Sequence, residues 1–307
     1  MVKGVYDLLV LGTGPAGMAA AIYAGRYDMK TLVIGKEIGG MTNLAGEIEN
    51  YPGFIGSGID LMKKFEEQAK MFGATFVMGN VDKLEKDKNG FRVEADGKDY
   101  VGKAIITGLG SEHRKLGVPG EKEFLGKGVS YCATCDGNFF RGKTVVVVGG
   151  SDSAAKAAIY LSSICKKVYV SYRKEKMRAE PINLDRVEKL KNVEIIYNTK
   201  PVEIVGEAKV TGLKLETTDG KKLKSDLIAV DGVFIEIGST PITQVVEGLG
   251  VELEKGYIKV DKEGRTNVAG LFAAGDGTNN PFKQAITAAA DGSLAAKAAY
   301  NFVKLGK

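Results

Sequence analysis

The chain is poor in the residues that bind metals or form disulfide scaffolds. Among its 307 residues it has one histidine, His113, and three cysteines. Three cysteines are too few for a disulfide-stabilised domain. A zinc site built on the pair Cys132 and Cys135 would need two more ligands, for which only Cys165 and His113 are available. We therefore expect no metal site.

The sequence also lacks a long apolar run and a concentrated block of charge. No segment approaches the roughly 20 apolar residues that cross a bilayer, and the start of the chain has no signal-peptide pattern. The formal net charge of +5 is spread along the chain without aromatic interleaving, which gives no support to nucleic-acid binding. We expect a reduced, cytoplasmic enzyme with no membrane segment, long enough for two domains.

A glycine-rich turn follows the apolar run 8–11 and opens into a helical stretch at 18–27. Its residues are Gly12, Thr13, Gly14, Pro15, Ala16 and Gly17. In such a strand-turn-helix unit the first glycine permits the turn, the second lets the backbone approach a pyrophosphate, and the third lets helix pack on strand. The helix N-terminus then faces the phosphate charge. The pattern predicts dinucleotide binding.

A second, degenerate copy follows the valine-rich run 144–148 and precedes a helical run at 155–162. Its residues are Gly149, Gly150, Ser151, Asp152, Ser153 and Ala154. Ser151 takes the place of the second glycine, so its side chain narrows the path by which the backbone approaches a pyrophosphate.

Cationic residues follow the next expected strand, 167–172. They are Arg173, Lys174 and Arg178. An acidic residue here would prefer the ribose 2′-hydroxyl of NAD, whereas cations accept the 2′-phosphate of NADP. NADPH is therefore favoured if a nicotinamide binds. A solvated Lys/Arg surface is the alternative.

A Cys-x-x-Cys pair, Cys132 and Cys135, lies between the two fingerprints. With this spacing one thiolate attacks a partner disulfide and the other resolves the mixed disulfide. Asp136 follows directly, and a carboxyl beside a buried dithiol can acquire a raised pKa and transfer a proton. A zinc half-site or an N-capping role for Asp136 are the competing interpretations. We expect Cys165 to be a small buried hydrophobe within a helix, and His113 to be a solvated loop histidine.

Breaker residues at 116–120 and 238–241 divide the chain into three segments. We expect residues 1–114 and 241–307 to form one domain, with residues 115–240 inserted as a second. The remaining expected elements are a helix at 58–72, strands at 91–95, 100–106, 193–197 and 226–230, and a helix at 284–303; an apolar run at 233–237 and the segment 271–276 lie between the last strand and the last helix. The expected fold class is α/β, with two Rossmann-like three-layer ββα nucleotide-binding domains.

Several motifs together resemble one family over nearly the whole chain. They are the first fingerprint, Glu49-Asn50-Tyr51-Pro52-Gly53, Thr107-Gly108, Ser130–Gly137 around the cysteine pair, Ala274-Gly275-Asp276, and Lys283-Gln284. The chain resembles the low-molecular-weight thioredoxin reductases, which are FAD enzymes with a redox disulfide in the NADPH domain.

The resemblance implies a role for each matching residue. The FAD residues it implies are Gly12, Gly14, Pro15, Ala16, Gly17, Gly40, Asn50, Thr107, Gly108, Gly275, Asp276, Lys283, Gln284 and Ala285. Asp276 would hold a ribityl hydroxyl, and the helix that follows would point its N-terminus at the isoalloxazine. Cys135 would receive electrons from the flavin, Cys132 would attack the partner, and Asp136 would be the general acid. The implied partner is thioredoxin or a thioredoxin-like protein, and the implied assembly is a homodimer.

The chain departs from the family mainly on the nicotinamide side. The departures there are Ser151, Lys156-Ala157, Tyr172-Arg173-Lys174, Ser239 and Ile242, and the milder ones on the FAD side are Met41 and Lys283. The tentative NADPH residues are Gly149, Ser151, Asp152, Ser153, Arg173, Lys174 and Arg178. Relatives with decayed NADPH sites take electrons from reduced ferredoxin or a deazaflavin, so these donors stay open. A flavin dithiol oxidase and a non-catalytic redox sensor are the other classes that stay open.

Overall fold

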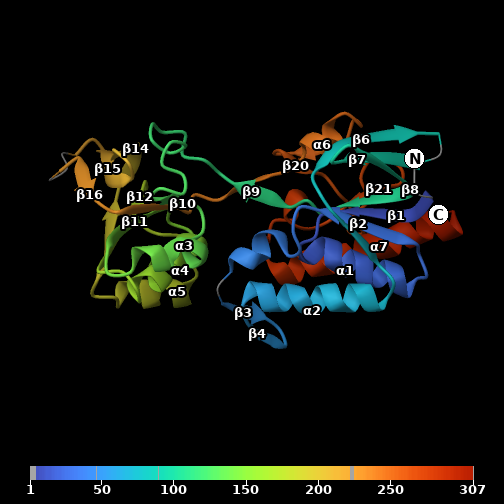
Figure 1. The fold of residues 1–307 in the computed structure, drawn as a ribbon, viewed down its shortest axis with the longest axis horizontal. Helices are drawn as coiled ribbons and strands as arrows, with labels where there is room; N and C mark the ends of the chain where they lie inside the picture. The colour runs from blue at the N-terminus through green and yellow to red at the C-terminus, as the bar shows by residue number, and fades with distance from the viewer. Residues whose placement is uncertain (1–4, 46, 89, 222–224, 307) are drawn as a thin grey trace. The chain divides into compact units, whose positions relative to one another are not determined.

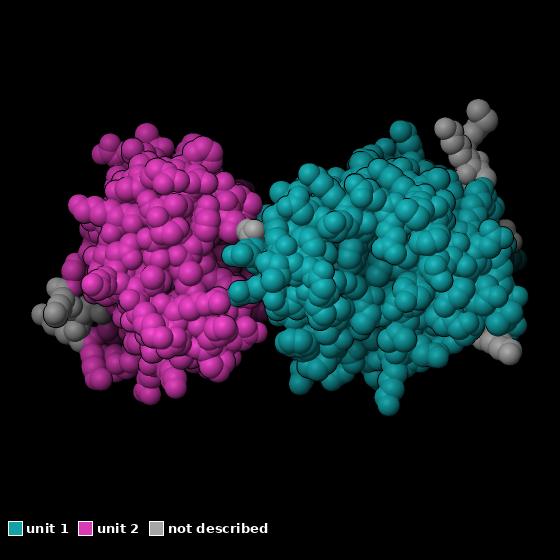
Figure 2. Space-filling view, turned by 90° about the horizontal axis from the view of Figure 1, so that it is seen from below, with its two compact units in different colours: residues 1–112, 241–307 teal, residues 113–240 magenta. Residues whose placement is uncertain are grey.

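The computed structural model describes residues 5–45, 47–88, 90–221 and 225–306. It divides into two compact units, shown in teal and magenta in Figure 2. Unit 1 comprises residues 1–112 and 241–307, and unit 2 comprises residues 113–240. Both units combine helices with parallel sheets (Figure 1), which confirms the expected α/β class.

Unit 1 is built on a sheet with the strand order β5-β2-β1-β8-β7-β6, to which β21 adds by pairing with β8. Strands β5, β2, β1, β8 and β21 are parallel, and β7 and β6 join antiparallel. Its elements are β1 (Val5–Leu11), α1 (Pro15–Arg26), β2 (Thr31–Gly35), η1 (Gly40–Leu44), β3 (Ile48–Tyr51), β4 (Phe54–Gly56), α2 (Gly58–Met71), β5 (Thr75–Met78), β6 (Val81–Asp87), β7 (Gly90–Ala95), β8 (Lys98–Thr107), α6 (Gln244–Glu247), β19 (Leu253–Glu254), β20 (Tyr257–Ile258), β21 (Leu271–Ala273), η3 (Gly275–Gly277) and α7 (Ala285–Leu305).

Strand β1 shows why both faces of the parallel strands of unit 1 are covered. Successive strand residues point to opposite faces. Leu8 and Val10 pack with α1, α2 and α7, whereas Leu9 and Leu11 pack with β6 and β7. Figure 1 shows α1, α2 and α7 together on one side of β1. Small residues bring α1 and α7 close, since a Cβ on Gly292 would lie 2.0 Å from the Ala16 carbonyl oxygen.

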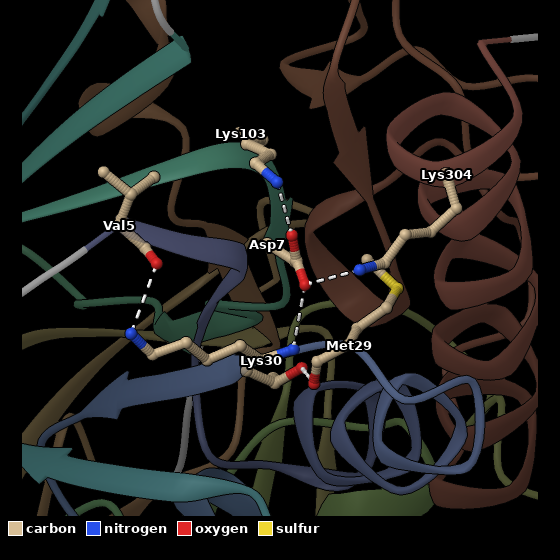
Figure 3. A network of polar contacts seen from close by, with 7 residues as sticks. Val5, Asp7, Met29, Lys30, Lys103 and Lys304 are labelled. Carbon is tan, nitrogen blue, oxygen red and sulfur yellow. Dashed lines mark hydrogen bonds and ion pairs between the residues drawn. The ribbon is translucent and has the colours of Figure 1, made fainter.

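A buried carboxylate ties three elements of unit 1 together (Figure 3). Asp7 of β1 is 9% exposed and accepts hydrogen bonds from Lys103 Nζ of β8 at 2.8 Å and Lys304 Nζ of α7 at 2.9 Å. The Lys30 N–H donates to it at 3.2 Å. Burial alone would raise the pKa of Asp7, but these donors outweigh burial and lower it to about 2.

Unit 2 is built on a parallel sheet with the order β10-β17-β11-β12-β13 and a three-stranded antiparallel sheet, β14-β15-β16. Its elements are β10 (Val129–Ser130), α3 (Ala133–Asp136), η2 (Gly137–Phe140), β11 (Thr144–Val148), α4 (Asp152–Ser162), β12 (Lys167–Tyr172), α5 (Pro181–Glu188), β13 (Val193–Tyr197), β14 (Thr199–Gly206), β15 (Val210–Thr217), β16 (Leu227–Ala229) and β17 (Gly232–Ile235). Two short strands at the unit boundaries, β9 (Ser111–His113) and β18 (Ser239–Pro241), pair with each other.

The four valines of β11 divide between two faces. Val145 and Val147 pack with α4 and α5, whereas Val146 and Val148 pack with β14 and β15. Figure 1 shows α3, α4 and α5 on one side of β11 and the antiparallel strands on the other. The layered arrangement around each parallel sheet confirms the expected three-layer fold.

Most expected elements are present, with differences at helix starts. Strands β11, β12 and β13 have the expected bounds, but α1 begins at Pro15 and α4 at Asp152, three residues earlier than expected in each case. Pro is favoured in the first helical turn because its missing N–H has no helical partner there. None of the helices in the described parts of the chain is long and apolar enough to span a membrane.

Candidate functional site

Backbone packing requires glycine at two positions of the first fingerprint, Gly12 and Gly17. Gly12 has φ +111°, and its N–H donates to the Ile34 carbonyl oxygen at 2.7 Å. A Cβ on Gly12 would lie 2.2 Å from the Gly108 carbonyl oxygen, and one on Gly17 would lie 1.9 Å from the Gly12 carbonyl oxygen. Side chains at either position would therefore displace backbone.

Gly14 differs, because protein packing does not require a glycine there. It is the N-cap of α1 with φ −80° and ψ −173°, which other residues adopt. The nearest atom to an added Cβ would be the Gly39 carbonyl oxygen, 3.7 Å away. A ligand that must approach this backbone closely would explain the glycine.

The other expected flavin residues lie in unit 1 and several are in contact. Asn50 Nδ2 donates to Gln284 Oε1 at 2.9 Å across 234 positions of sequence. The Ala274 N–H donates to the Thr107 carbonyl oxygen at 3.0 Å. A Cβ on Gly275 would lie 3.0 Å from the Ala16 Cβ. The ends of β1, β8, β21 and the start of α7 thus supply one site.

Asp276 offers an acceptor for a ligand hydroxyl. It is partly buried, and burial raises its pKa, with Lys283 opposing the rise. Within the described residues its carboxylate accepts no hydrogen bond. Lys283 itself donates to the Thr278 carbonyl oxygen and lies 4.5 Å from the centre of the Tyr257 ring. A polar ligand group with a hydroxyl fits this carboxylate.

The dithiol pair lies at the start of α3 in unit 2. Cys132 and Cys135 form a disulfide with Cα atoms 5.3 Å apart. The Cys135 N–H donates to Cys132 Sγ at 3.1 Å, and Thr134 Oγ1 lies 3.4 Å from the same sulfur. Ser130 Oγ accepts the Cys132 N–H at 2.9 Å. An N–H and a hydroxyl of α3 therefore lie within hydrogen-bond distance of Cys132 Sγ.

A buried glutamate that the sequence did not indicate supports the residue before Cys132. Glu121 is 6% exposed and accepts hydrogen bonds from the Tyr131 hydroxyl at 2.7 Å and from the N–H groups of Leu116 and Gly117 at 2.7 and 2.6 Å. Burial and this carboxylate raise the pKa of Tyr131. The stretch around Glu121 is charged, so its sequence pattern indicates a solvated surface instead.

The expectation of a solvated His113 is wrong. His113 ends β9 and stacks on Tyr131, with ring centres 5.6 Å apart. Its Nε2 is buried without a hydrogen-bond partner among the residues described, and burial lowers its pKa. The aromatic neighbour comes from 18 positions further along the chain, which local sequence does not reveal.

Cys165 is buried, as expected, but it follows α4 instead of lying within it. Its Sγ donates to the Phe140 carbonyl oxygen at 3.4 Å, and burial raises its pKa to about 11. A thiol with this pKa remains protonated and unreactive at neutral pH.

The second fingerprint repeats the backbone of the first. Ser151 is the N-cap of α4 with φ −95° and ψ −173°, close to the values at Gly14. Gly149 has φ +148°, and a Cβ there would lie 2.1 Å from the Glu236 carbonyl oxygen. Ser151 therefore fits the turn itself, and its hydroxymethyl group projects at the position where Gly14 has no side chain.

The tentative NADPH residues gather where β11 and β12 end. The Arg178 N–H donates to the Gly150 carbonyl oxygen at 2.7 Å, and its Nε donates to the Tyr172 hydroxyl at 3.2 Å. Arg173 and Lys174 follow β12 directly and are exposed. Ligands of open α/β sheets bind outside these carboxyl ends.

The Asp152 carboxylate forms its contacts with neighbouring residues of unit 2. Its carboxylate accepts from Asn183 Nδ2 at 2.8 Å and pairs with Lys156 at 3.0 Å. Burial opposes ionisation of Asp152, but these donors outweigh burial and lower its pKa. Asp152 thus anchors α4 to α5.

Comparisons with known proteins agree with this geometry. The family described as pyridine nucleotide-disulphide oxidoreductase matches residues 6–292. A thioredoxin reductase of Listeria monocytogenes is 45% identical over 305 residues, which cover 98% of this chain and 94% of that protein. A crystal structure of Lactococcus lactis thioredoxin reductase has a TM-score of 0.93 at 38% identity, covering 97% of this chain and 99% of the other. A ferredoxin-flavin thioredoxin reductase from Clostridium acetobutylicum has a TM-score of 0.53 at 35% identity, covering 98% and 99%.

Proposed function

We infer the function from the premise that the chain belongs to the pyridine nucleotide-disulphide oxidoreductase family and, within it, to the thioredoxin reductases. We propose that it is a flavoenzyme that reduces the disulfide of thioredoxin or a thioredoxin-like protein. The observation that carries the proposal is the disulfide of Cys132 and Cys135 in a chain whose first fingerprint has a glycine, Gly14, that protein packing does not require.

Unit 1 is the proposed flavin domain. Gly12, Gly14 and Gly17 would hold the pyrophosphate at the start of α1, and Asp276 would accept a ribityl hydroxyl. Gln284, which caps α7, and Asn50 would border the ring system. A flavin bound there would, once reduced by the donor, supply the two electrons that reduce the disulfide.

The dithiol in unit 2 would transfer those electrons to the partner. The Cys132 thiolate attacks one sulfur of the partner disulfide, and that S–S bond breaks as a mixed disulfide forms. The Cys135 thiolate then attacks Cys132 Sγ, which restores the Cys132–Cys135 bond and releases the partner as a dithiol. Two electrons leave the chain, and we propose Asp136 as the group that passes a proton to the departing thiolate.

NADPH is the proposed electron donor, bound at the second fingerprint of unit 2. The exposed Arg173 and Lys174, with Arg178, would pair with the 2′-phosphate because charge-assisted hydrogen bonds to phosphate are strong. The N-terminus of α4 would face the pyrophosphate. Reduced ferredoxin is the second candidate, since the Clostridium relative is named for that donor and Ser151 fills space at this fingerprint.

Anaerobic stopped-flow measurements with NADPH, NADH and reduced ferredoxin would identify the donor. We expect NADPH to bleach the flavin faster than NADH. Cys132→Ser and Cys135→Ser variants should keep flavin reduction by the donor but lose thioredoxin reduction. The matched control is Cys165→Ser, which removes a buried thiol outside the pair and should keep both steps. Full thioredoxin turnover in Cys135→Ser would overturn the dithiol relay.

A further inference from the structure

Tyr131 and Cys132 form the short link between β10 and α3. Strand β10 ends at Ser130 and α3 begins at Ala133, so both link residues lie outside these elements. A buried side chain holds the backbone of Cys132, because Ser130 is 3% exposed and its Oγ bonds to both backbone groups of Cys132. The Oγ accepts the Cys132 N–H at 2.9 Å and donates to the Cys132 carbonyl oxygen at 3.2 Å.

The side chain of Tyr131 ties the same link to a second segment of unit 2. Its hydroxyl donates to Glu121 Oε1 at 2.7 Å. The other two donors to this carboxylate, the N–H groups of Leu116 and Gly117, lie five and four positions before Glu121. Tyr131 lies ten positions after it. The Tyr131 hydroxyl therefore joins the segment that contains Glu121 to the residue before Cys132.

Several contacts together fix the orientation of the Tyr131 ring. Glu121 is 6% exposed, and a buried carboxylate depends on its hydrogen-bond donors, so the contact at the hydroxyl is a strong one. One face of the ring stacks on His113, with ring centres 5.6 Å apart. The ring also packs against the apolar cluster that contains Val129 and Val148. Movement of Tyr131, and with it of the link to Cys132, would break these contacts.

Cys132 bonds to two different sulfur atoms in turn during the proposed reaction. After the mixed disulfide has formed, the Cys135 thiolate attacks Cys132 Sγ and restores the bond between the two cysteines. This closing step is intramolecular, so its equilibrium depends on how well the two backbones are held at bonding separation. The Cα atoms of the pair are 5.3 Å apart. Contacts that hold the backbone of Cys132 therefore favour closure of the disulfide.

We propose that Tyr131 is a positioning residue for the dithiol and that Glu121 acts through it: their hydrogen bond keeps Cys132 at bonding separation from Cys135. The inference rests on the proposed function, in which closure of this disulfide releases the reduced partner. A contact that only stabilised the fold would affect the disulfide and dithiol forms equally. A positioning contact instead changes the equilibrium between these two forms.

Equilibrium with glutathione measures how tightly the disulfide closes. Two glutathione thiols give two electrons and two protons to the disulfide of Cys132 and Cys135, which opens to a dithiol as glutathione disulfide forms. The FAD-loaded protein is equilibrated without oxygen and quenched with an alkylating agent, and mass spectrometry measures the alkylated fraction of each cysteine. Tyr131→Phe keeps the ring but loses the hydroxyl. We expect it to shift the equilibrium about fivefold toward the dithiol, which is about 20 mV at roughly 30 mV per tenfold change.

Glu121→Gln tests whether Glu121 acts through Tyr131. The amide nitrogen of glutamine is a donor, so the new side chain cannot accept all three hydrogen bonds. We expect a shift in the same direction. Glu121→Gln combined with Tyr131→Phe should shift the equilibrium no further than the larger single change. Additive shifts would overturn the role assigned to Glu121.

Tyr169→Phe is the matched control. Tyr169 of β12 packs against the same apolar cluster as Tyr131, so its variant should leave the equilibrium unchanged. An equilibrium in Tyr131→Phe equal to that of the unmodified protein would overturn the inference, as would an equal shift in Tyr169→Phe. Where Glu121→Gln does not fold, Tyr131→Phe and its control decide alone.

Failure of the proposed function would give a different result. An unmodified protein that exchanges its disulfide with glutathione but does not reduce thioredoxin would overturn the proposed function. The glutathione equilibrium needs no protein partner, so the shift in Tyr131→Phe would still decide whether Tyr131 positions the dithiol.

Discussion

The variant Gly14→Ser gives the first fingerprint the serine that the second fingerprint has at Ser151. It tests why residue 14 is a glycine. In Gly14→Ser the backbone need not change, because Ser151 holds almost the same φ and ψ as the N-cap of α4. Serine is also a favoured N-cap residue, so the apoprotein should change in stability by less than about 0.5 kcal/mol. The new side chain would instead enter space facing the ligand.

Gly14→Ser should therefore weaken the binding of FAD. Overpacking a close contact costs about 2 kcal/mol, which is roughly a thirtyfold increase in the dissociation constant of FAD. Flavin fluorescence would measure the rebinding of FAD to the apoprotein. Urea unfolding would measure the stability of the same apoprotein.

Gly17→Ala is the matched control for this test. Its Cβ would lie 1.9 Å from the Gly12 carbonyl oxygen, so the apoprotein itself should lose about 3 kcal/mol or more. Unchanged FAD affinity in Gly14→Ser would refute the reasoning that a ligand, and not the fold, requires this glycine.

Three further predictions follow from contacts described above. Asp7→Asn should destabilise unit 1 by about 2 kcal/mol at pH 7, because its pKa falls from 3.8 to about 2 on folding and each unit is worth ~1.4 kcal/mol. This stability is present above pH about 4 and is lost as the pH falls toward 2. The free energies of urea unfolding of the variant and the unmodified protein should therefore converge near pH about 2. As a control, Asp99→Asn, which removes a more exposed ion pair, should cost less than about 1 kcal/mol. Tyr131→Phe removes one of the three donors to Glu121 and should lower the free energy of unfolding by about 1 kcal/mol, measured by urea unfolding. Arg173→Ala should weaken calorimetric binding of NADP⁺ about fivefold while leaving NAD⁺ unchanged. Equal losses for both nucleotides would contradict a 2′-phosphate role.

The sequence was most informative where local chemistry determines structure. The valine run 144–148 forms β11 within its expected bounds, since a buried parallel strand has β-branched residues on both faces. Glycine spacing likewise located both turns, because Gly12 and Gly149 adopt positive φ values that other residues avoid. The helix starts were misplaced because turn residues such as Pro15 and Asp152 also form the first helical turn.

The sequence was least informative where distant residues meet. His113 has charged neighbours in sequence, yet it stacks on Tyr131, and Glu121 is buried within a charged stretch. Glu236 follows an apolar strand, where alternation alone does not distinguish a solvent-facing glutamate from the half-buried one that the structure shows. Each of these positions depends on pairing between segments, which periodicity does not specify.

Comparison of the two fingerprints shows where fold and function separate in this chain. Each turn follows the carboxyl end of a buried parallel strand and begins a helix. The N-cap residue of each helix has extended φ and ψ. A Cβ on Gly14 would make an ordinary contact with the Gly39 carbonyl oxygen at 3.7 Å, whereas Ser151 has a hydroxyl that lies 3.1 Å from the hydroxyl of Ser153. The backbone alone would assign equal dinucleotide affinity to both units. Because a pyrophosphate needs close approach to the backbone of the turn, the side chains predict a firmly held cofactor in unit 1 and a more weakly held donor in unit 2.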